Sequence, residues 1–210
     1  GCTGEIVSNQ GLLLTNHHCG FDWIQYHSTV EHDYLTHGFW AMSKEEELPC
    51  PGISAVMLKS MEDVTDRVLE GVTKETSNDE RAEIVTENIK KIKEEAENNS
   101  DYQVVIKSFY HGNKYYMIYN EVFKDVRLVG APPSNIGKFG GDTDNWVWPR
   151  HTGDFSIFRI YVSPDGKAAD YSEDNVPYKP NYHFSISLKG ANEGDFTFVF
   201  GYPARTNEYL

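Results

Sequence analysis

The sequence predicts a mainly β fold with helical additions. Aromatic residues make up 13% of the 210 positions, and 17 glycines and 9 prolines interrupt the chain. Most apolar runs are short; aromatic residues favour strands, whereas glycine and proline favour turns. This composition therefore favours an all-β plan with added helices over a helical bundle. At this length the chain can bury a sizeable core, as one large domain or two small ones.

The chain begins with a predicted β-hairpin. Residues 4–8 and 11–15 are short apolar segments on either side of Asn9-Gln10, a pair that is compatible with a turn. Residues 21–40 combine histidines and aromatic residues without clean periodicity, so they are predicted to form an ordered connecting segment. A further strand is expected at residues 53–58, after a break rich in proline and glycine.

Between residues 62 and 99 the composition changes to Glu, Lys, Asp and Asn, and this stretch is predicted to contain an amphipathic helix. Ser77 followed by Glu80 is the pattern of a capping box at its start. The helix has a single apolar stripe, formed by Ile84, Val85, Ile89, Ile92 and Ala96. Its charged remainder is most simply a solvated face.

Further strand candidates follow the helix, at residues 104–110, 114–119, 121–129, 154–162, 183–188 and 195–202. His111-Gly112-Asn113 is the expected turn after the first of them. The segment 131–152 is rich in Gly, Pro and Asp, yet it contains Phe139, Trp146 and Trp148. Such a composition is typical of a structured functional loop.

The charge of the chain excludes some classes of partner. The net charge is −13, and a phosphate-binding surface needs clustered Lys and Arg, so no nucleic acid partner is expected. No apolar run reaches the roughly 20 residues that span a bilayer, so no membrane span is expected either. The chain opens directly with Gly1-Cys2, without a signal-like leader, which predicts a mature or trimmed soluble protein.

The three cysteines, Cys2, Cys19 and Cys50, allow at most one intrachain disulfide. Cys2 and Cys19 flank the predicted hairpin, so their Cα atoms can approach to the separation of about 4.4–6.8 Å that a disulfide requires. Closing that loop stabilises a protein by roughly 3 kcal/mol in the chain-entropy model, and it would imply an oxidising compartment. The alternative is three reduced, buried thiols in a cytosolic protein.

The sharpest chemical signal is Asn16-His17-His18-Cys19 at the end of a predicted strand. A histidine that acts as a general base must be held by packing and by a hydrogen bond to its outer nitrogen. Asp154, at the lip of a later strand, can accept that hydrogen bond as the third member of a triad. The alternatives are a pair of surface or metal-capable histidines, and an aspartate that caps a turn.

Together these residues resemble the first barrel of the chymotrypsin-like peptidases. In those proteins a cysteine precedes a strand pair, the catalytic histidine stands before the partner cysteine, and the aspartate opens a later strand. Cys2, His18-Cys19 and Asp154 fill these places. The resemblance implies a trypsin-like, six-stranded antiparallel barrel, the first of two, over residues 1–210 with a helical insertion at about residues 62–99. It favours His18 as the base, and because neighbours in a strand face opposite sides, His18 rather than its neighbour should point toward Asp154.

A closer resemblance rests on residues 1–4, 11–20, 129–134, 137–154 and 201–203. These segments are similar to the bacterial dipeptidyl peptidase 7 and dipeptidyl peptidase 11 family of serine exopeptidases. The resemblance implies removal of dipeptides from the free N-terminus of peptides and a periplasmic or cell-surface location. No cofactor or metal is expected, and a homodimer is one candidate for the full-length enzyme, whose oligomeric state the sequence leaves open. The resemblance also implies that Asn145 and Trp146 hold the substrate's α-amino group, since an amide oxygen accepts from an ammonium and an indole shields it.

The family's nucleophile lies several hundred residues further on, in a Gly-Asn-Ser-Gly-Ser-Pro-like motif beyond a large helical domain. No serine of this chain has a Gly-x-Ser-Gly setting. Acyl transfer has no site without a nucleophile and its oxyanion-hole amides. The chain is therefore expected to be an N-terminal fragment, without the helical domain and the second barrel, and inactive by itself.

Two other classes of function compete with this interpretation. A metal-dependent hydrolase is disfavoured, because there is no His-Glu-x-x-His and the spacing of His27, His32 and His37 scatters them around a helix. The run from Asp142 opens like a calcium loop, but apolar residues replace the next ligand and the glycine. The other alternative is a non-catalytic module that binds peptide N-termini through the aromatic loop.

Overall fold

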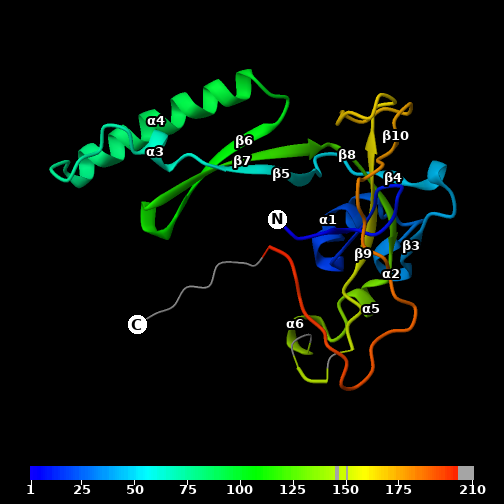
Figure 1. Cartoon of the computed structure of the whole chain (residues 1–210). Coiled ribbons are helices and arrows are strands. Elements are labelled where there is room, and N and C mark those ends of the chain that lie inside the picture. Colours follow the sequence, from blue (N-terminus) through cyan, green and yellow to red (C-terminus); the bar gives the residue numbers. More distant parts are fainter. Residues whose placement is uncertain (145–146, 150, 203–210) are drawn as a thin grey trace. The chain divides into compact units, whose positions relative to one another are not determined.

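The computed structural model describes residues 1–144, 147–149 and 151–202. The chain divides into two units along its sequence (Figure 1). Residues 1–53 and 124–210 form the first unit, and residues 54–123 form the second.

An antiparallel sheet is the frame of the first unit. Its strands are β1 (Glu5–Ile6), β2 (Leu12–Thr15), β3 (Phe39–Trp40), β4 (Leu48–Pro49), β8 (Asp125–Ala131), β9 (Ser156–Val162) and β10 (Val176–Pro177). The order is β1-β2-β9-β8-β3, with β10 paired to β9 and β4 paired to β8. The prediction of a mainly antiparallel β fold is confirmed. In the described part of the chain the sheet is open, because its path does not return from β3 to β1.

The two central strands, β8 and β9, carry most of the core of the first unit. Both are almost completely buried, and Val126, Leu128, Phe158 and Ile160 are at most 1% exposed. Burial of each such side chain stabilises the fold by about 1.5–3 kcal/mol. These strands form the buried centre of the unit, and α1 packs against both of them.

Short helices occupy the connections of the first unit: α1 (His17–His27), α2 (Tyr34–His37), α5 (Ser134–Gly137), α6 (Gly141–Asp144) and the 3-10 helix η1 (Lys44–Glu46). The segment at residues 21–40, predicted only as an ordered connection, thus contains most of α1 and all of α2. The buried residues of α1 are His17, Gly20 and Ile24, which have helical spacing. A histidine and a glycine carry no apolar signal, so the periodicity of this face is hidden in the sequence.

A buried ion pair lies at the start of β8. Arg127 donates hydrogen bonds to both carboxylate oxygens of Asp125, at 3.0 and 2.8 Å, and Asn175 donates to the same carboxylate at 2.9 Å. The guanidinium also lies 3.8 Å from the centroid of the Tyr161 ring. Asp125 is 1% exposed, so these groups replace its hydration shell.

The second unit has a sheet and a core of its own. Its strands β5 (Ala55–Asp63), β6 (Gln103–Phe109) and β7 (Lys114–Phe123) have the order β5-β7-β6. Two α-helices, α3 (Thr65–Val68) and α4 (Asn78–Asn98), pack on one side of this sheet (Figure 1), and η2 (Tyr110–Gly112) joins β6 to β7. The predicted capping box is confirmed, because Ser77 and Glu80 bond each other's backbone N–H groups at the start of α4.

The extent of the second unit differs from the expected helical insertion at about residues 62–99. Val64, Val68, Ile92, Val104 and Met117 form one buried cluster that joins its helices to its strands. The sheet β5-β7-β6 is therefore needed to bury the apolar stripe of α4. Residues 54–123 therefore form one layered unit of strands and helices, of which α4 is only a part.

Two of the expected strands are absent, since residues 183–188 and 195–202 form no strand in the structure. Phe196, Phe198 and Phe200, which alternate as in a strand, are 88%, 75% and 78% exposed. Alternation supplies a potential apolar face, but a strand also needs a neighbour that accepts its backbone hydrogen bonds.

In the part of the chain that the structure describes, no helix is long and apolar enough to cross a membrane.

Asp125→Ala is expected to lower the free energy of unfolding by about 3–5 kcal/mol, because it leaves the buried Arg127 guanidinium without its counter-charge. Asp170→Ala is the matched control, since Asp170 forms an exposed ion pair with Lys124 at 3.1 Å, and such pairs contribute about 0–1 kcal/mol. Urea denaturation of both variants measures the difference. Equal losses of stability would contradict the role of the buried pair.

Candidate active site

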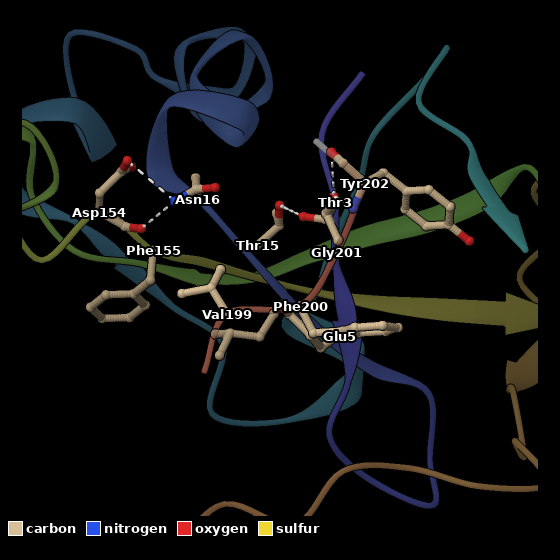
Figure 2. A pocket seen from close by; sticks show the side chains of 11 residues that line it. Thr3, Glu5, Thr15, Asn16, Asp154, Phe155, Val199, Phe200, Gly201 and Tyr202 are labelled. Atoms are coloured by element: carbon tan, nitrogen blue, oxygen red, sulfur yellow. Dashed lines mark hydrogen bonds between the residues drawn. The ribbon is translucent and has the colours of Figure 1, made fainter. Parts of the chain in front are cut away.

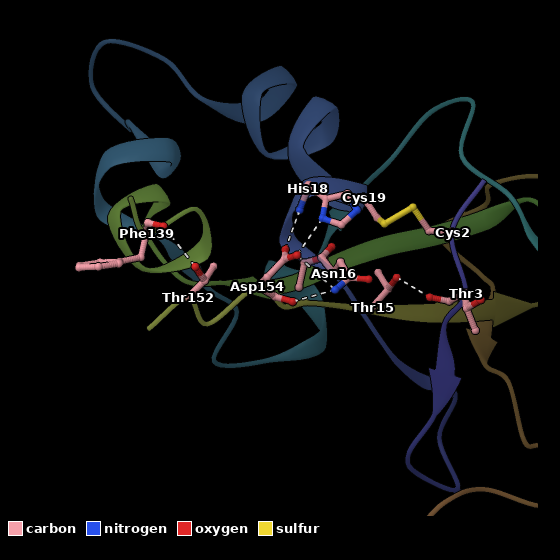
Figure 3. Close-up of polar contacts among 10 residues, drawn as sticks. Cys2, Thr3, Thr15, Asn16, His18, Cys19, Phe139, Thr152 and Asp154 are labelled. Carbon is pink, nitrogen blue, oxygen red and sulfur yellow. Dashed lines mark hydrogen bonds and ion pairs between the residues drawn. A yellow bond between two sulfur atoms is a disulfide. The ribbon is translucent and has the colours of Figure 1, made fainter. Parts of the chain in front are cut away.

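His18 and Asp154 lie side by side although they are 136 residues apart in the sequence (Figure 3). Nδ1 of His18 is 2.8 Å from Oδ2 of Asp154. A carboxylate only accepts hydrogen bonds, so Nδ1 carries a proton, and in the neutral form of the ring Nε2 has the free lone pair. The His18 side chain is 68% exposed and that of Asp154 is 22% exposed. This geometry suits a general base that is oriented by an acid and carried on a largely exposed side chain.

The Asp154 carboxylate also holds the first turn of α1. Its Oδ1 accepts from the backbone N–H of His18 at 3.1 Å. Asn16 is the N-cap residue of α1, but its side chain makes no cap hydrogen bond. Instead its Nδ2 donates to Oδ2 and to the backbone oxygen of Asp154, at 3.3 and 3.2 Å. Asp154 thus takes over the capping role, and a carboxylate at a helix N-terminus is favoured by the helix dipole.

The two neighbouring histidines point in different directions for a reason that differs from the prediction. Strand β2 ends at Thr15, and His17 and His18 are the first residues of α1. Successive side chains of a helix diverge by about 100°, and here His17 turns inward, where it is 1% exposed. The expected approach of His18 to Asp154 is present, but the strand argument for it is wrong.

Cys2 and Cys19 form a disulfide beside His18 (Figure 3). Their Cα atoms are 6.2 Å apart, and the bridge ties the segment before β1 to the first turn of α1. Cys50 is a free, buried cysteine. Burial raises the pKa of the Cys50 thiol to about 12, which makes it a poor nucleophile.

One group of potential metal ligands occurs among the described residues, formed by Cys2, Cys19 and His18, whose ligand atoms lie within 4.8 Å of one another. The two sulfurs are bonded to each other and are therefore not free thiolates. His27, one of the histidines considered for a metal site, has its Nε2 at 2.8 Å from the Pro49 carbonyl oxygen.

A cavity of about 530 Å³ opens beside the Asp154 carboxylate (Figure 2). Asn16 and Asp154 line one end, and Thr3, Glu5 and residues 199–202 line other parts of the wall. The Tyr202 backbone N–H donates to the Thr3 hydroxyl at 3.0 Å, which fastens this part of the wall. The first residues of the chain and a late segment therefore form the wall of a cavity next to the aspartate.

Asn145 and Trp146, the residues expected to bind the α-amino group, lie outside the described residues. Asn16 and His17 belong to the motif that the sequence singled out, but no role of their own was predicted for them, and the structure places both at the site. Asparagine is a favoured N-cap residue. Asn16 could therefore have indicated in the sequence that a helix begins at residue 17. His17 gave no signal that distinguishes it from a surface histidine.

Comparison with known proteins identifies a class of enzyme. The chain is 55% identical over 210 residues to an Asp/Glu-specific dipeptidyl-peptidase of Capnocytophaga gingivalis. The alignment covers all of this chain and 30% of that protein. The chain is 52% identical over 217 residues to dipeptidyl-peptidase 7 of Phocaeicola vulgatus, again with 30% of that protein covered. The crystal structure of Porphyromonas endodontalis DPP11 in complex with the dipeptide Arg-Glu matches with a TM-score of 0.79 and 51% identity, over 93% of this chain and 29% of that chain.

The relatives are thus dipeptidyl peptidases, and the chain spans about 30% of the length of those curated relatives. The family model of peptidase S46 matches residues 1–210. The chain therefore belongs to the peptidase S46 family.

Titration of thiols tests the cysteine chemistry of the site. In the native protein no thiol is expected to react rapidly at about pH 8, since the thiolate is the reactive form and Cys50 is buried with its pKa raised to about 12. Unfolding without reductant is expected to expose one thiol, and unfolding after reduction three. Three thiols without reductant would rule out the disulfide between Cys2 and Cys19.

Proposed function

We propose that this chain is the histidine- and aspartate-bearing part of a serine-type dipeptidyl peptidase, with His18 as the general base and Asp154 as its orienting acid. The observation that carries the proposal is the 2.8 Å contact between His18 Nδ1 and Asp154 Oδ2, in a chain of the peptidase S46 family. The exposure of the His18 side chain supports it, because the base must reach a substrate and a nucleophile.

In the proposed mechanism Nε2 of His18 takes the proton of a serine hydroxyl as the oxygen attacks the scissile carbonyl carbon. Asp154 accepts the Nδ1–H hydrogen bond throughout and stabilises the imidazolium that forms. His18 then donates the proton to the departing amine, so that the acyl group stays on the serine until water releases it. The serine and its oxyanion hole belong to a part of the enzyme outside this chain, because none of its serines has a Gly-x-Ser-Gly setting.

The domain plan that goes with this mechanism is two trypsin-like barrels. Residues 1–210 would contribute the first barrel, a six-stranded one, and a second barrel would contribute the serine. The second unit, residues 54–123, would then be an elaboration of the first barrel. The pairing of β2 with β9, which brings His18 and Asp154 together, supports this assignment.

The proposed substrates are peptides with a free N-terminus. One relative in complex with a dipeptide, the P. endodontalis DPP11, supports this class. Asn145 and Trp146 are proposed to hold the α-amino group. Relatives named Asp/Glu-specific and relatives named dipeptidyl-peptidase 7 match with similar identity, so no preference for one side chain before the cut is part of the proposal.

A periplasmic or cell-surface location is part of the proposal, and the disulfide beside His18 supports it, because disulfides persist in oxidising compartments. The full-length enzyme is proposed to be a homodimer without cofactor or metal. The 210-residue chain alone is proposed to lack turnover and at most to bind peptide N-termini. The alternative of a non-catalytic binding module therefore applies only to the separate chain.

His18→Ala in the full-length enzyme is expected to lower kcat by on the order of 10⁴-fold, as for other triads. His32→Ala, a change of an exposed histidine of the same unit, is the control and should leave kcat unchanged. Turnover of dipeptide-linked reporters measures both. The separate 210-residue chain should show no turnover, and reporter cleavage by it that depends on His18 would mean that one of its own serines is the nucleophile.

Asn145→Ala is expected to lower kcat/KM for substrates with a free amine by about 10- to 100-fold, since a hydrogen bond to a charged group contributes about 1.5–3 kcal/mol. Cleavage of the same substrates with an acylated N-terminus should change little, so the preference for the free amine shrinks. Asn98→Ala, at the exposed end of α4, is the control. Equal losses on free and blocked substrates would exclude Asn145 from amine recognition.

A further inference from the structure

His17 is a polar side chain placed in the core next to the proposed base. It is 1% exposed, whereas the side chain of its neighbour His18 is 68% exposed. Its Nε2 atom has no hydrogen-bond partner among the described residues. A buried polar atom without a partner destabilises the folded state, so an apolar side chain would fill the same space at lower cost. The histidine must therefore contribute something other than core packing.

The His17 ring is held against the segment that contains α5. It is hydrogen-bonded to the backbone of Pro132, just before α5. At the end of α5, a Cβ atom on Gly137 would overlap the ring. The φ angle of Gly137 is not positive, so the glycine is required for room and not for an unusual backbone conformation. The imidazole thus stands where a side chain of residue 137 would otherwise be, and the centroid of the Phe21 ring lies 6.4 Å from that of the imidazole.

The same segment leads to Asp154. The Gly153 backbone N–H donates to the carbonyl oxygen of Ile136 at 3.0 Å. Ile136 is the neighbour of Gly137, which touches the His17 ring, and Gly153 is the neighbour of Asp154. A closed path of contacts therefore runs from the first turn of α1, through the His17 ring and the α5 segment, to Asp154, and returns to α1 through His18.

We propose that His17 is a positioning residue, whose ring and hydrogen bond to Pro132 fix the α5 segment against α1 so that Asp154 is held within reach of His18. The catalytic consequence of this role rests on the proposed function, whereas the structural role does not. Burial lowers the pKa of His17, so the ring is neutral near pH 7 and adds no positive charge beside the imidazolium of the base. His17 itself, with 1% exposure, does not touch substrate.

Substitutions in the full-length protein separate this role from simple packing. His17→Leu fills the space but cannot bond Pro132, and His17→Asn keeps an N–H group close to the ring nitrogen it replaces. Proton NMR of the protein with labelled histidine follows the Nδ1–H proton of His18, which is observable while Asp154 holds it. In His17→Leu we expect loss of this resonance and on the order of 10²-fold lower kcat/KM, the scale of a misplacement of about 1 Å. His17→Asn should recover part of both.

His32→Leu is the matched control, because His32 is exposed, and it should change neither the resonance nor kcat/KM. Gly137→Ala perturbs the contact between the His17 ring and α5 from the α5 side. It tests the positioning role if the His17→Leu protein does not fold. A folded His17→Leu or Gly137→Ala protein with unchanged resonance and turnover would overturn the proposal, as would a His17→Asn protein no better than His17→Leu. If the resonance is lost in the variants but the unaltered protein shows no peptidase activity, the proposed function fails and the positioning role stands.

Discussion

The Asp154 carboxylate is the group on which the geometry of the site depends. One oxygen accepts the backbone N–H of His18 and the other accepts its ring N–H, at 3.1 and 2.8 Å. The same residue thus sets where α1 begins and how the imidazole at that position is turned. Removal of the carboxylate would free both the helix start and the ring, so the capping role and the orienting role cannot be separated by a single change.

The sheet explains how residues so far apart in sequence meet. In the antiparallel pairing of β2 with β9, Thr15 lies opposite Ser156. The residue after Thr15 and the residues before Ser156 therefore emerge at the same end of the sheet. Ser156 reinforces the junction, because its hydroxyl donates to the Asn16 carbonyl oxygen at 2.7 Å. The close approach of α1 to β9 also leaves no room for a side chain at Gly20, whose Cβ would lie 2.7 Å from the Ser156 hydroxyl.

The sequence allowed prediction of those features whose signals are local. The capping box of Ser77 and Glu80, the apolar stripe of α4 and the character of β9 are all written in short patterns. The approach of His18 to Asp154 came from a resemblance in spacing, not from local structure. Helix α1 was missed because its buried face includes a histidine and a glycine. The extent of the second unit was missed because it depends on which strands share a core with α4, a long-range property that periodicity does not report.

The disulfide between Cys2 and Cys19 has a consequence for resistance to proteolysis. It spans the hairpin of β1 and β2, whose turn at Asn9 and Gln10 is exposed. Exposed turns are preferred places for proteolytic nicking. A cut there would leave the short N-terminal piece covalently attached to the first turn of α1, with β1 still paired to β2. The nicked molecule would keep its edge strand and the surroundings of His18, so damage at the most accessible turn need not disassemble the site.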